Sequence, residues 1–400
     1  MTTYNFDKIT NRKGTNCLKY DFAVERGKPA DVLPLWVADM DFPVSEEISK
    51  SLHAAVEHGI YGYTQPKDAY YNAVMNWMER NHNWKTEREW IVKTPGVVFA
   101  LGAAVRAFTD PGDAILIQNP VYYPFTNIVR DNDRRVVDNT LIYEKTTGQS
   151  GDNGYRIDFE DFERKLEQEH IKLFILCNPH NPVGRVWKVE ELQQLGEICL
   201  RHHVIVVSDE IHNDFVYPGY EHTVFANVDP RFAEFTVTCT APSKTFNLAG
   251  LQVSNIFISN ENLRKAFKAE IDRTGYDEPN ALGVVACEAA YRAGEDWLDQ
   301  LRAYLLKNLN FLRDYLREKI PQIHLVEPEG TYLVWLDCSE LGITGKELDQ
   351  FIVDKAGLWL DGGSMFGPSG AAFQRVNIAC PRATLQLALD KLKTAVDTLK

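Results

Sequence analysis

Short apolar runs constrain the fold of this chain more strongly than any other feature. A strand that is apolar on both faces is buried on both faces, as in a parallel sheet covered by helices. Between two of the runs, residues 189–202 have their apolar side chains at helical spacing. This alternation predicts an α/β fold with a mostly parallel sheet. The runs are 114–117, 173–177, 204–207 and 235–238.

The chain is long enough, at 400 residues, for one large domain and one smaller domain. Helical spacing from 281 to 320 predicts a long helical stretch that links the two. We expect a large domain over 46–285, and a small α+β domain made of 1–45 and 286–400. The stretch 148–154 is expected to be an exposed connection. After the long helix we expect strands at 331–336 and 375–379 and helices at 346–355 and 383–399.

Charge and composition exclude several classes of protein. The net charge of -13 argues against a nucleic-acid partner. The sequence contains neither a run of about 18 apolar residues nor an apolar signal segment near its start, so no membrane span or secretion is expected. Its seven cysteines are scattered, without a CxxC pair or a histidine at metal spacing. We therefore expect reduced core thiols, no metal site and a cytoplasmic protein.

Three polar residues follow successive predicted strands, at the edge where open α/β sheets bind ligands. Asn178 is suited to donate to a phenolic oxygen, Asp209 to keep a pyridine nitrogen protonated, and Lys244 to form an imine and then move a proton. Each residue alone has an ordinary explanation, as a turn, a helix cap or a surface lysine. Together they predict a pyridoxal phosphate site with Lys244 as the anchor.

Other segments complete this predicted site. Thr94 to Val98 precede a helix of small residues, so the backbone amides of Val97 and Val98 could hold a phosphate. The nucleotide motifs GxGxxG and GxxxxGK[ST] are absent from the sequence. Tyr122 offers a ring that could stack on a planar cofactor, and Tyr123 offers a phenol for proton transfer, although both could simply pack in an aromatic loop.

Two further side chains are candidates for the substrate and the second layer of the site. His212 lies close to Asp209 in the sequence and could support it, although a lone histidine is more often structural. Arg375 lies on a predicted strand, and its guanidinium could hold the carboxylate of an amino-acid substrate. The alternative for Arg375 is a salt bridge near the domain boundary.

At these residues the sequence resembles the fold-type I pyridoxal phosphate enzymes, the aspartate aminotransferase superfamily. The resemblance covers most of the chain. It implies a large domain with a mostly parallel, seven-stranded sheet between helices, and a small α+β domain. The matching segments are Asn178 to Gly184, similar to NPHNPTG, Ser208 to His212, similar to D-E-x-[YH], the Ser243-Lys244 pair, and Arg375 to Asn377, similar to R-[LV]-N.

A narrower resemblance is to the MalY/PatB group of cystathionine β-lyases, or C–S lyases. It implies that Tyr122 stacks on the cofactor ring and that Tyr123 assists proton transfer. It also implies a homodimer with shared active sites, in which Tyr63 reaches the phosphate of the neighbouring subunit. The loop 36–41, which includes Ala38, would close over the substrate. The segments that carry this resemblance are 36–42, 61–63, 94–98, 119–125 and 241–247.

Departures from the wider superfamily favour the lyase branch. Gln252 stands where an aminotransferase usually has a phosphate-binding arginine, and Ala241 stands where it often has serine. The phosphate would then depend on the amides of Val97 and Val98, on Ser243, on Thr240, and on Tyr63 of the partner subunit. We expect β-elimination from L-cystathionine or related cysteine S-conjugates, giving pyruvate, ammonia and a thiol. The alternatives are an amino-acid aminotransferase and, in another class, a regulatory protein that binds a transcription factor.

Overall fold

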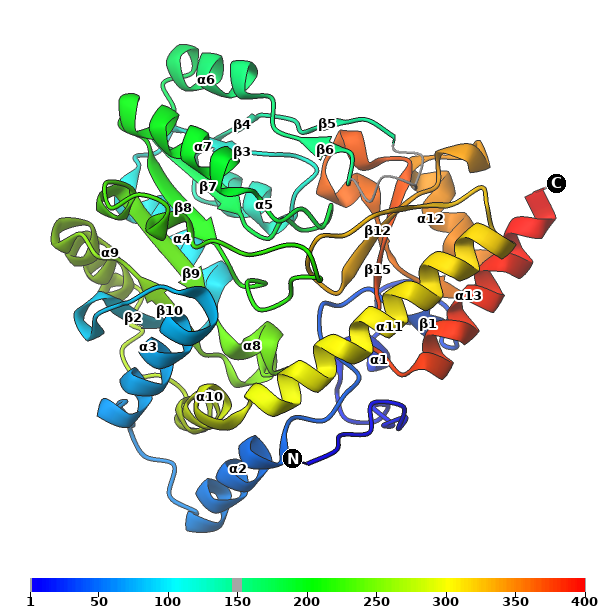
Figure 1. Ribbon diagram of the computed structural model, residues 1–400, viewed down its shortest axis with the longest axis horizontal. Helices are drawn as coiled ribbons and strands as arrows, with labels where there is room; N and C mark the ends of the chain where they lie inside the picture. The colour runs from blue at the N-terminus through cyan, green and yellow to red at the C-terminus, as the bar shows by residue number, and fades with distance from the viewer. Residues whose placement is uncertain (1, 146–152, 400) are drawn as a thin grey trace.

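A seven-stranded sheet forms the centre of the larger part of the molecule (Figure 1). The computed structural model describes residues 2–145 and 153–399. The strand order is β2-β10-β9-β8-β7-β3-β4, and only β10 runs antiparallel to its neighbours. The predicted α/β fold with a mostly parallel sheet is therefore confirmed. The strands are β2 (Ile91–Thr94), β3 (Ala114–Ile117), β4 (Arg135–Asp138), β7 (Leu173–Cys177), β8 (Ile205–Asp209), β9 (Thr236–Thr240) and β10 (Ser254–Phe257).

Helices cover both faces of this sheet, which explains why its strands β3 and β7 are apolar on both faces. Along β7, Leu173 and Ile175 belong to the core beneath α4, α5 and α9, whereas Phe174 and Leu176 belong to the core beneath α6 and α7. All four side chains are buried. The covering helices are α4 (Val97–Phe108), α5 (Pro124–Asp131), α9 (Glu261–Arg273), α6 (Phe159–Gln168) and α7 (Val189–Arg201).

The predicted helical stretch 281–320 is two helices, α10 (Ala281–Ala293) and α11 (Glu295–Lys319). They meet at Gly294, where a side chain would collide with the ring of Phe246. The absence of a side chain at Gly294 therefore lets Phe246 fill the junction between the helices. Helix α11 then runs from beside α8 (Pro242–Thr245) to α13 (Arg382–Val396), so it spans the two parts of the molecule (Figure 1).

A second, antiparallel sheet of four strands lies in the C-terminal part of the chain, in the order β11-β12-β15-β14. Two of its strands are the predicted ones, with ends displaced by one or two residues. The N-terminal segment contacts this part, because β1 pairs with β13 in parallel. The division at residues 45 and 286 stays a prediction. The elements are β11 (His324–Val326), β12 (Leu333–Asp337), β15 (Phe373–Asn377), β14 (Asp361–Gly362), β1 (Leu33–Pro34), β13 (Leu358–Trp359) and α12 (Gly345–Asp354).

The remaining N-terminal elements are α1 (Leu18–Asp21), α2 (Glu46–His58) and α3 (Asp68–His82). Of the expected exposed connection 148–154, residues 148–152 lie outside the described residues. At Asn153 the expectation is wrong, because this side chain is buried. Its amide donates to the carbonyls of Val183 at 2.7 Å and Glu327 at 2.8 Å, and so joins the two parts of the chain.

The prediction that the cysteines lie in the core is confirmed for six of the seven, which are buried. All seven cysteines are free, and Cys17 alone among them is partly exposed. Within residues 2–145 and 153–399, no helix combines the length and apolar character needed to cross a membrane. In the same part of the chain, no three His, Cys, Asp or Glu side chains come together as a metal site would require.

Candidate active site

A cavity of about 190 Å³ lies at the carboxyl ends of β7, β8 and β9. Residues at the ends of neighbouring parallel strands meet at one edge of a sheet, which is where open α/β folds bind their ligands. The structure brings most of the predicted site residues together at this edge. The predicted site residues that line the cavity are Ala38, Val97, Val98, Tyr122, Asp209, His212, Ser243 and Lys244.

Lys244 lies on the short helix α8, immediately after β9, and is half-buried. Its Nζ donates to the carbonyl oxygen of Ala38 at 2.8 Å. Burial lowers the pKa of Lys244 to about 8, against the attraction of Asp39, and the charge of Arg375 lowers it further. A substantial share of the amine is consequently neutral near physiological pH, which is the form that attacks an aldehyde.

Asp209 ends β8 on the same edge of the sheet and is 5% exposed. Its Oδ1 accepts a hydrogen bond from the backbone N–H of Ile211 at 3.2 Å. Burial raises the pKa of Asp209 to about 7, although this hydrogen bond and the nearby Lys244 both act to lower it. A buried carboxyl group whose charge is stabilised by so few partners fits a cationic N–H of a bound ligand. Such a cation would stabilise the carboxylate form.

The third side of the cavity is the N-terminus of α4. The helix begins at Val97 after Gly96, and no side chain caps it. Its first N–H groups have no partner within the helix, and they carry the positive end of the helix dipole. Gly96, Val97, Val98 and the partly buried Ser243 all line the cavity. This combination suits a phosphate, as the sequence predicted.

The asparagine at the cavity is Asn181, whereas Asn178 does not line it. The amide of Asn178 instead donates to the carbonyl of Thr223 at 3.1 Å. The prediction chose Asn178 because it directly follows β7, but the chain turns after that point and brings Asn181 over the cavity. Both residues belong to the segment that resembles NPHNPTG, so the motif was informative even though the position within it was not.

Arg375 lies just behind the cavity lining, on β15 of the small sheet, and is 3% exposed. Its Nη1 donates to Oδ1 of Asn181 at 2.9 Å, and its Nη2 donates to the carbonyl of Trp36 at 3.0 Å. Nη2 also forms an ion pair with Asp361. The Nε of Arg375 is buried without a partner among the described residues. The guanidinium is thus held in place and keeps a donor to spare, as the carboxylate of a substrate would require.

Comparisons with known proteins agree with this site. The family model described as aminotransferase class I and II matches residues 30–392. The chain belongs to this family. It is 46% identical over 392 residues to cystathionine beta-lyase PatB from Bacillus subtilis (strain 168), and the match covers 98% of this chain and 100% of PatB.

Solved structures give the same result for the fold. Cystalysin from Treponema denticola, whose structure contains a pyridoxal 5'-phosphate cofactor, matches with a TM-score of 0.95 at 38% identity, covering 100% of both chains. The PLP-bound C-S lyase from Staphylococcus hominis matches with a TM-score of 0.92 at 35% identity, covering 99% of this chain and 98% of that chain. The predicted fold-type I architecture is therefore confirmed.

In this member of the aminotransferase class I and II family, two tyrosines stand side by side at the cavity. Tyr122 lines it, and the ring of Tyr123 lies 5.5 Å from that of Tyr122, outside the lining. Burial raises the pKa of both phenols, so both stay protonated at neutral pH. His212 also lines the cavity, and burial lowers its pKa well below the usual value, so its ring is neutral.

The segment 36–42, which we call the strap, is fixed by two asparagines that the sequence-based analysis did not single out. The Nδ2 of Asn377 donates to the carbonyls of Val37 at 2.7 Å and Asp39 at 2.6 Å. Asn247 donates through Nδ2 to the carbonyls of Met40 at 2.9 Å and Phe42 at 3.0 Å. The loop that was expected to close over a substrate is thus already bonded on both sides.

These two asparagines lie close in sequence to the two cations of the site. Asn247 follows Lys244 by three residues, and Asn377 follows Arg375 by two. Their proximity in sequence to Lys244 and Arg375 was the available signal. Their partners are backbone carbonyls more than 200 residues away, which no local pattern identifies.

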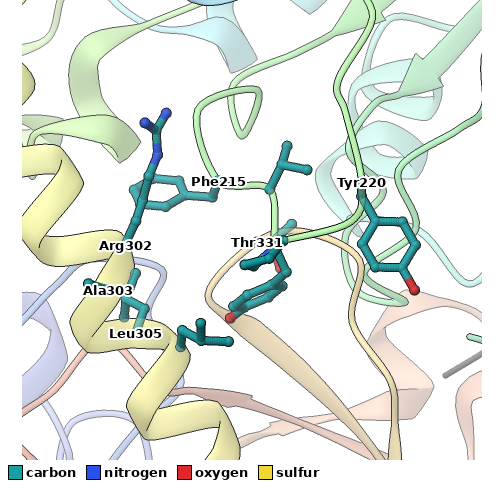
Figure 2. A pocket seen from close by; sticks show the side chains of 10 residues that line it. Phe215, Tyr220, Arg302, Ala303, Leu305 and Thr331 are labelled. Atoms are coloured by element: carbon teal, nitrogen blue, oxygen red, sulfur yellow. The ribbon is translucent and has the colours of Figure 1, made fainter.

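A larger cavity, of about 400 Å³, lies between the 215–220 loop and α11 (Figure 2). Its walls are mainly apolar, with Phe215 and Leu305 on opposite elements. Arg302 is held there, because its Nε donates to the carbonyl of Asp214 at 2.7 Å. In Figure 2 its guanidinium points away from Leu305. This cavity lacks the convergence of an amine, a carboxyl group and a free helix N-terminus that the smaller one has.

Proposed function

We propose that this protein is a pyridoxal-phosphate-dependent carbon–sulfur β-lyase. Its substrates are L-cystathionine or related cysteine S-conjugates, which it converts with water into pyruvate, ammonia and a thiol. The observation that carries this proposal is the convergence of Lys244, Asp209 and the uncapped N-terminus of α4 on one small cavity. The similarity to proteins named cystathionine beta-lyase and C-S lyase supports elimination over amino transfer.

The residues present fit each part of the cofactor. The amides of Val97 and Val98 and the hydroxyl of Ser243 would hold the phosphate, and Asp209 would hold the pyridine nitrogen. Asn181, which lines the cavity where Asn178 does not, would donate its amide to the phenolic oxygen. The ring of Tyr122 would stack on the cofactor, and His212 would support Asp209 from the same wall. When bound, pyridoxal phosphate supplies an electron sink for the electrons released at Cα.

The chain's own side chains carry the remaining steps. Arg375 binds the α-carboxylate and so orients the Cα–H bond, helped by its fixed contacts with Asn181 and Asp361. Lys244, whose pKa burial lowers to about 8, removes the Cα proton. Tyr123, still protonated at neutral pH, donates a proton to the leaving sulfur. The carbonyl of Ala38 holds Nζ of Lys244 next to the cavity between these steps.

The test separates elimination from amino transfer. Purified protein with pyridoxal phosphate should release equal amounts of pyruvate and thiol from L-cystathionine when no 2-oxo acid is present. An aminotransferase would need a 2-oxo acid for turnover and would release no thiol. Gln252, which stands where aminotransferases usually have a phosphate-binding arginine, is consistent with the first outcome. Product formation only on addition of a 2-oxo acid would overturn the proposal.

The enzyme is also proposed to work as a homodimer in the cytoplasm. The side chain of Tyr63 is 95% exposed, on the segment between α2 and α3 that also exposes Ile60 and Tyr61. An exposed apolar segment of this kind fits burial against a second copy, where Tyr63 would reach the neighbouring phosphate. Mixing inactive Lys244→Ala with inactive Tyr63→Ala should restore activity if sites are shared. Reduced thiols support the cytoplasmic location.

A further inference from the structure

A separate cavity of about 220 Å³ lies on the far side of Arg375 from the cofactor site. Trp36 and Asp361 line it, and both are partners of Nη2 of Arg375. Asn181, the partner of Nη1, lines the cofactor cavity. The guanidinium of Arg375 therefore stands between the two cavities. A substrate whose carboxylate binds Arg375 would have this second cavity close by.

Two cations line the second cavity, Arg26 and Lys28. Their side chains form no ion pair or hydrogen bond with any residue that the structure describes. Arg26 lies over the indole of Trp36, 5.3 Å from the ring centroid. The acidic side chains of the same lining already have partners, since Asp361 pairs with Arg375 and Oδ1 of Asp349 accepts from Gln374 at 2.7 Å. Among the described residues, Arg26 and Lys28 are therefore cations without an ion-pair partner, beside one carboxylate, that of Asp349, whose hydrogen bond comes from a neutral amide.

The position of Tyr123 links this cavity to the leaving group. Its ring meets that of Phe366 edge-on, with centroids 6.4 Å apart. Met365, the residue before Phe366, lines the second cavity and is 47% exposed. The charges of Asp361, Arg375 and Arg26 all act on the phenol of Tyr123. The ring of Phe366 therefore separates the phenol from Met365, a residue that lines the second cavity.

The walls of the second cavity also suit an alkyl chain. Trp36 and Trp359 both line it, and their rings stack with centroids 4.3 Å apart. The stacked indoles offer an apolar surface along which methylene groups can lie, while the cations beside them offer charge. An apolar wall next to unpaired cations is complementary to a short chain that ends in an anion.

We propose that Arg26 and Lys28 form a subsite for an anionic group at the distal end of the sulfur substituent. The enzyme then prefers cysteine S-conjugates that carry a distal carboxylate, the class to which cystathionine belongs, over neutral conjugates of the same size. This inference rests on the proposed lyase function, because it assigns the second cavity to that enzyme's substrate.

The experiment compares two conjugates that differ only in distal charge, S-(3-carboxypropyl)-L-cysteine and its terminal amide. The holoenzyme is studied as wild type, as Arg26→Ala/Lys28→Ala, and as the control Lys85→Ala/Lys346→Ala. The control lysines are exposed and line neither cavity, yet their removal changes the net charge equally. We expect the test variant to lose about tenfold in kcat/KM for the carboxylate, through KM, as two partly exposed charge contacts would predict.

The test variant should keep its kcat/KM for the amide, and the control variant should keep its kcat/KM for both conjugates. An equal loss on both conjugates, or an unchanged ratio between them, would overturn the subsite. Affinity measured from the change in cofactor absorbance on binding gives the same ratio without any need for cleavage. If the wild type released pyruvate from neither conjugate, the lyase proposal would fail, while the affinity ratio would still decide the subsite.

Discussion

The two sides of the active site are built on opposite electrostatic principles. One side, which we call the floor, comes from the seven-stranded sheet and carries Asp209, Ser243 and Lys244. The other side, which we call the wall, comes from the small sheet and carries Asp361, Arg375 and Asn377. The floor groups have pKa values that burial displaces to about 7 for Asp209 and about 8 for Lys244. The wall places its one cation against a carboxylate, an amide oxygen and a backbone carbonyl.

This difference separates the work of the two sides. Groups with displaced pKa values are ready to change protonation state, so the floor is suited to making and breaking bonds. A guanidinium fixed by a carboxylate, an amide oxygen and a backbone carbonyl does not change its protonation state, so the wall is suited to holding a substrate in one orientation. Substitutions on the floor should therefore lower kcat, and substitutions on the wall should mainly raise KM.

The largest effect is expected on the floor at Lys244. Lys244→Ala removes both the cofactor anchor and the proposed base, and pyruvate release should fall about 10⁴-fold or more, as for other lost nucleophiles. Borohydride treatment of the wild type should fix the cofactor covalently on the peptide that contains Lys244, and the variant should retain none. Near-normal pyruvate release by Lys244→Ala would show that the floor takes no part in the reaction.

Asp209→Asn should lower kcat about 10³-fold, the scale on which one directed electrostatic group acts, because an amide cannot keep the pyridine nitrogen protonated. The same substitution should stabilise the cofactor-free protein at neutral and higher pH. The folded-state pKa of Asp209 is raised from 3.8 to about 7, so the folded state binds the proton more tightly than the unfolded state. Its contribution to the free energy of unfolding is lost as pH rises from about 4 to about 7, by at most about 1.4 kcal/mol per pH unit.

The measurement is thermal or denaturant unfolding of cofactor-free wild type and Asp209→Asn at pH 5 and pH 8. The difference in stability between them should grow in favour of the variant at the higher pH. A pH-independent difference would show that Asp209 is not held in its protonated form, and the contrast between floor and wall would lose one of its two supports.

On the wall, Arg375→Lys should raise KM between about 10- and 100-fold and change kcat much less, since an ammonium cannot reproduce the fork of donors. Alanine is the poorer choice, because it would leave Asp361 buried without its partner. Asp361→Asn is the companion variant, which keeps the shape of the wall but removes the carboxylate that holds Arg375. A loss confined to kcat in Arg375→Lys would contradict the proposed division of work.

Several of these features could be predicted from the sequence, because each one depends on a pattern within a single short segment. The apolar run that became β7 reflects burial on two faces, and the helical spacing of 189–202 reflects burial on one, and each segment shows its pattern by itself. Asp209 and Lys244 were found because strand ends in a parallel sheet converge on one edge. The same logic selected Asn178 over Asn181, because the path of a turn after a strand is not encoded in apolar periodicity.

Contacts between distant segments could not be predicted in this way. The strap 36–42 reads as an ordinary loop in the sequence, and its motif gave only the expectation that it would close over a substrate. Its carbonyls are in fact bonded to Asn247 from the floor side and Asn377 from the wall side. Side-chain amides that satisfy backbone carbonyls across more than 200 residues follow from the three-dimensional fold alone.

The smallest expected effects come from these two asparagines, and they sharpen the comparison most. Asn377→Ala leaves the carbonyls of Val37 and Asp39 without a donor, and Asn247→Ala leaves that of Phe42 without one, since Met40 also accepts from Arg12, so each should cost about 1–3 kcal/mol in the free energy of unfolding. Their kinetic effects should differ in kind. Asn247 follows the last residue of α8, the helix that carries Lys244, by two positions, so its loss should act chiefly on kcat, through the placement of Lys244.

Asn377 shares its strand with Arg375, so its loss should act chiefly on KM. The measurement is a pair of kinetic profiles on L-cystathionine, taken beside thermal unfolding curves that report the structural cost of each substitution. If both variants lose similar stability, but one changes kcat and the other changes KM, then each end of the strap supports the group on its own side. If both variants change kcat and KM in the same way, the strap acts as one rigid unit. The distinction between floor and wall would then apply only to the side chains that touch substrate and cofactor.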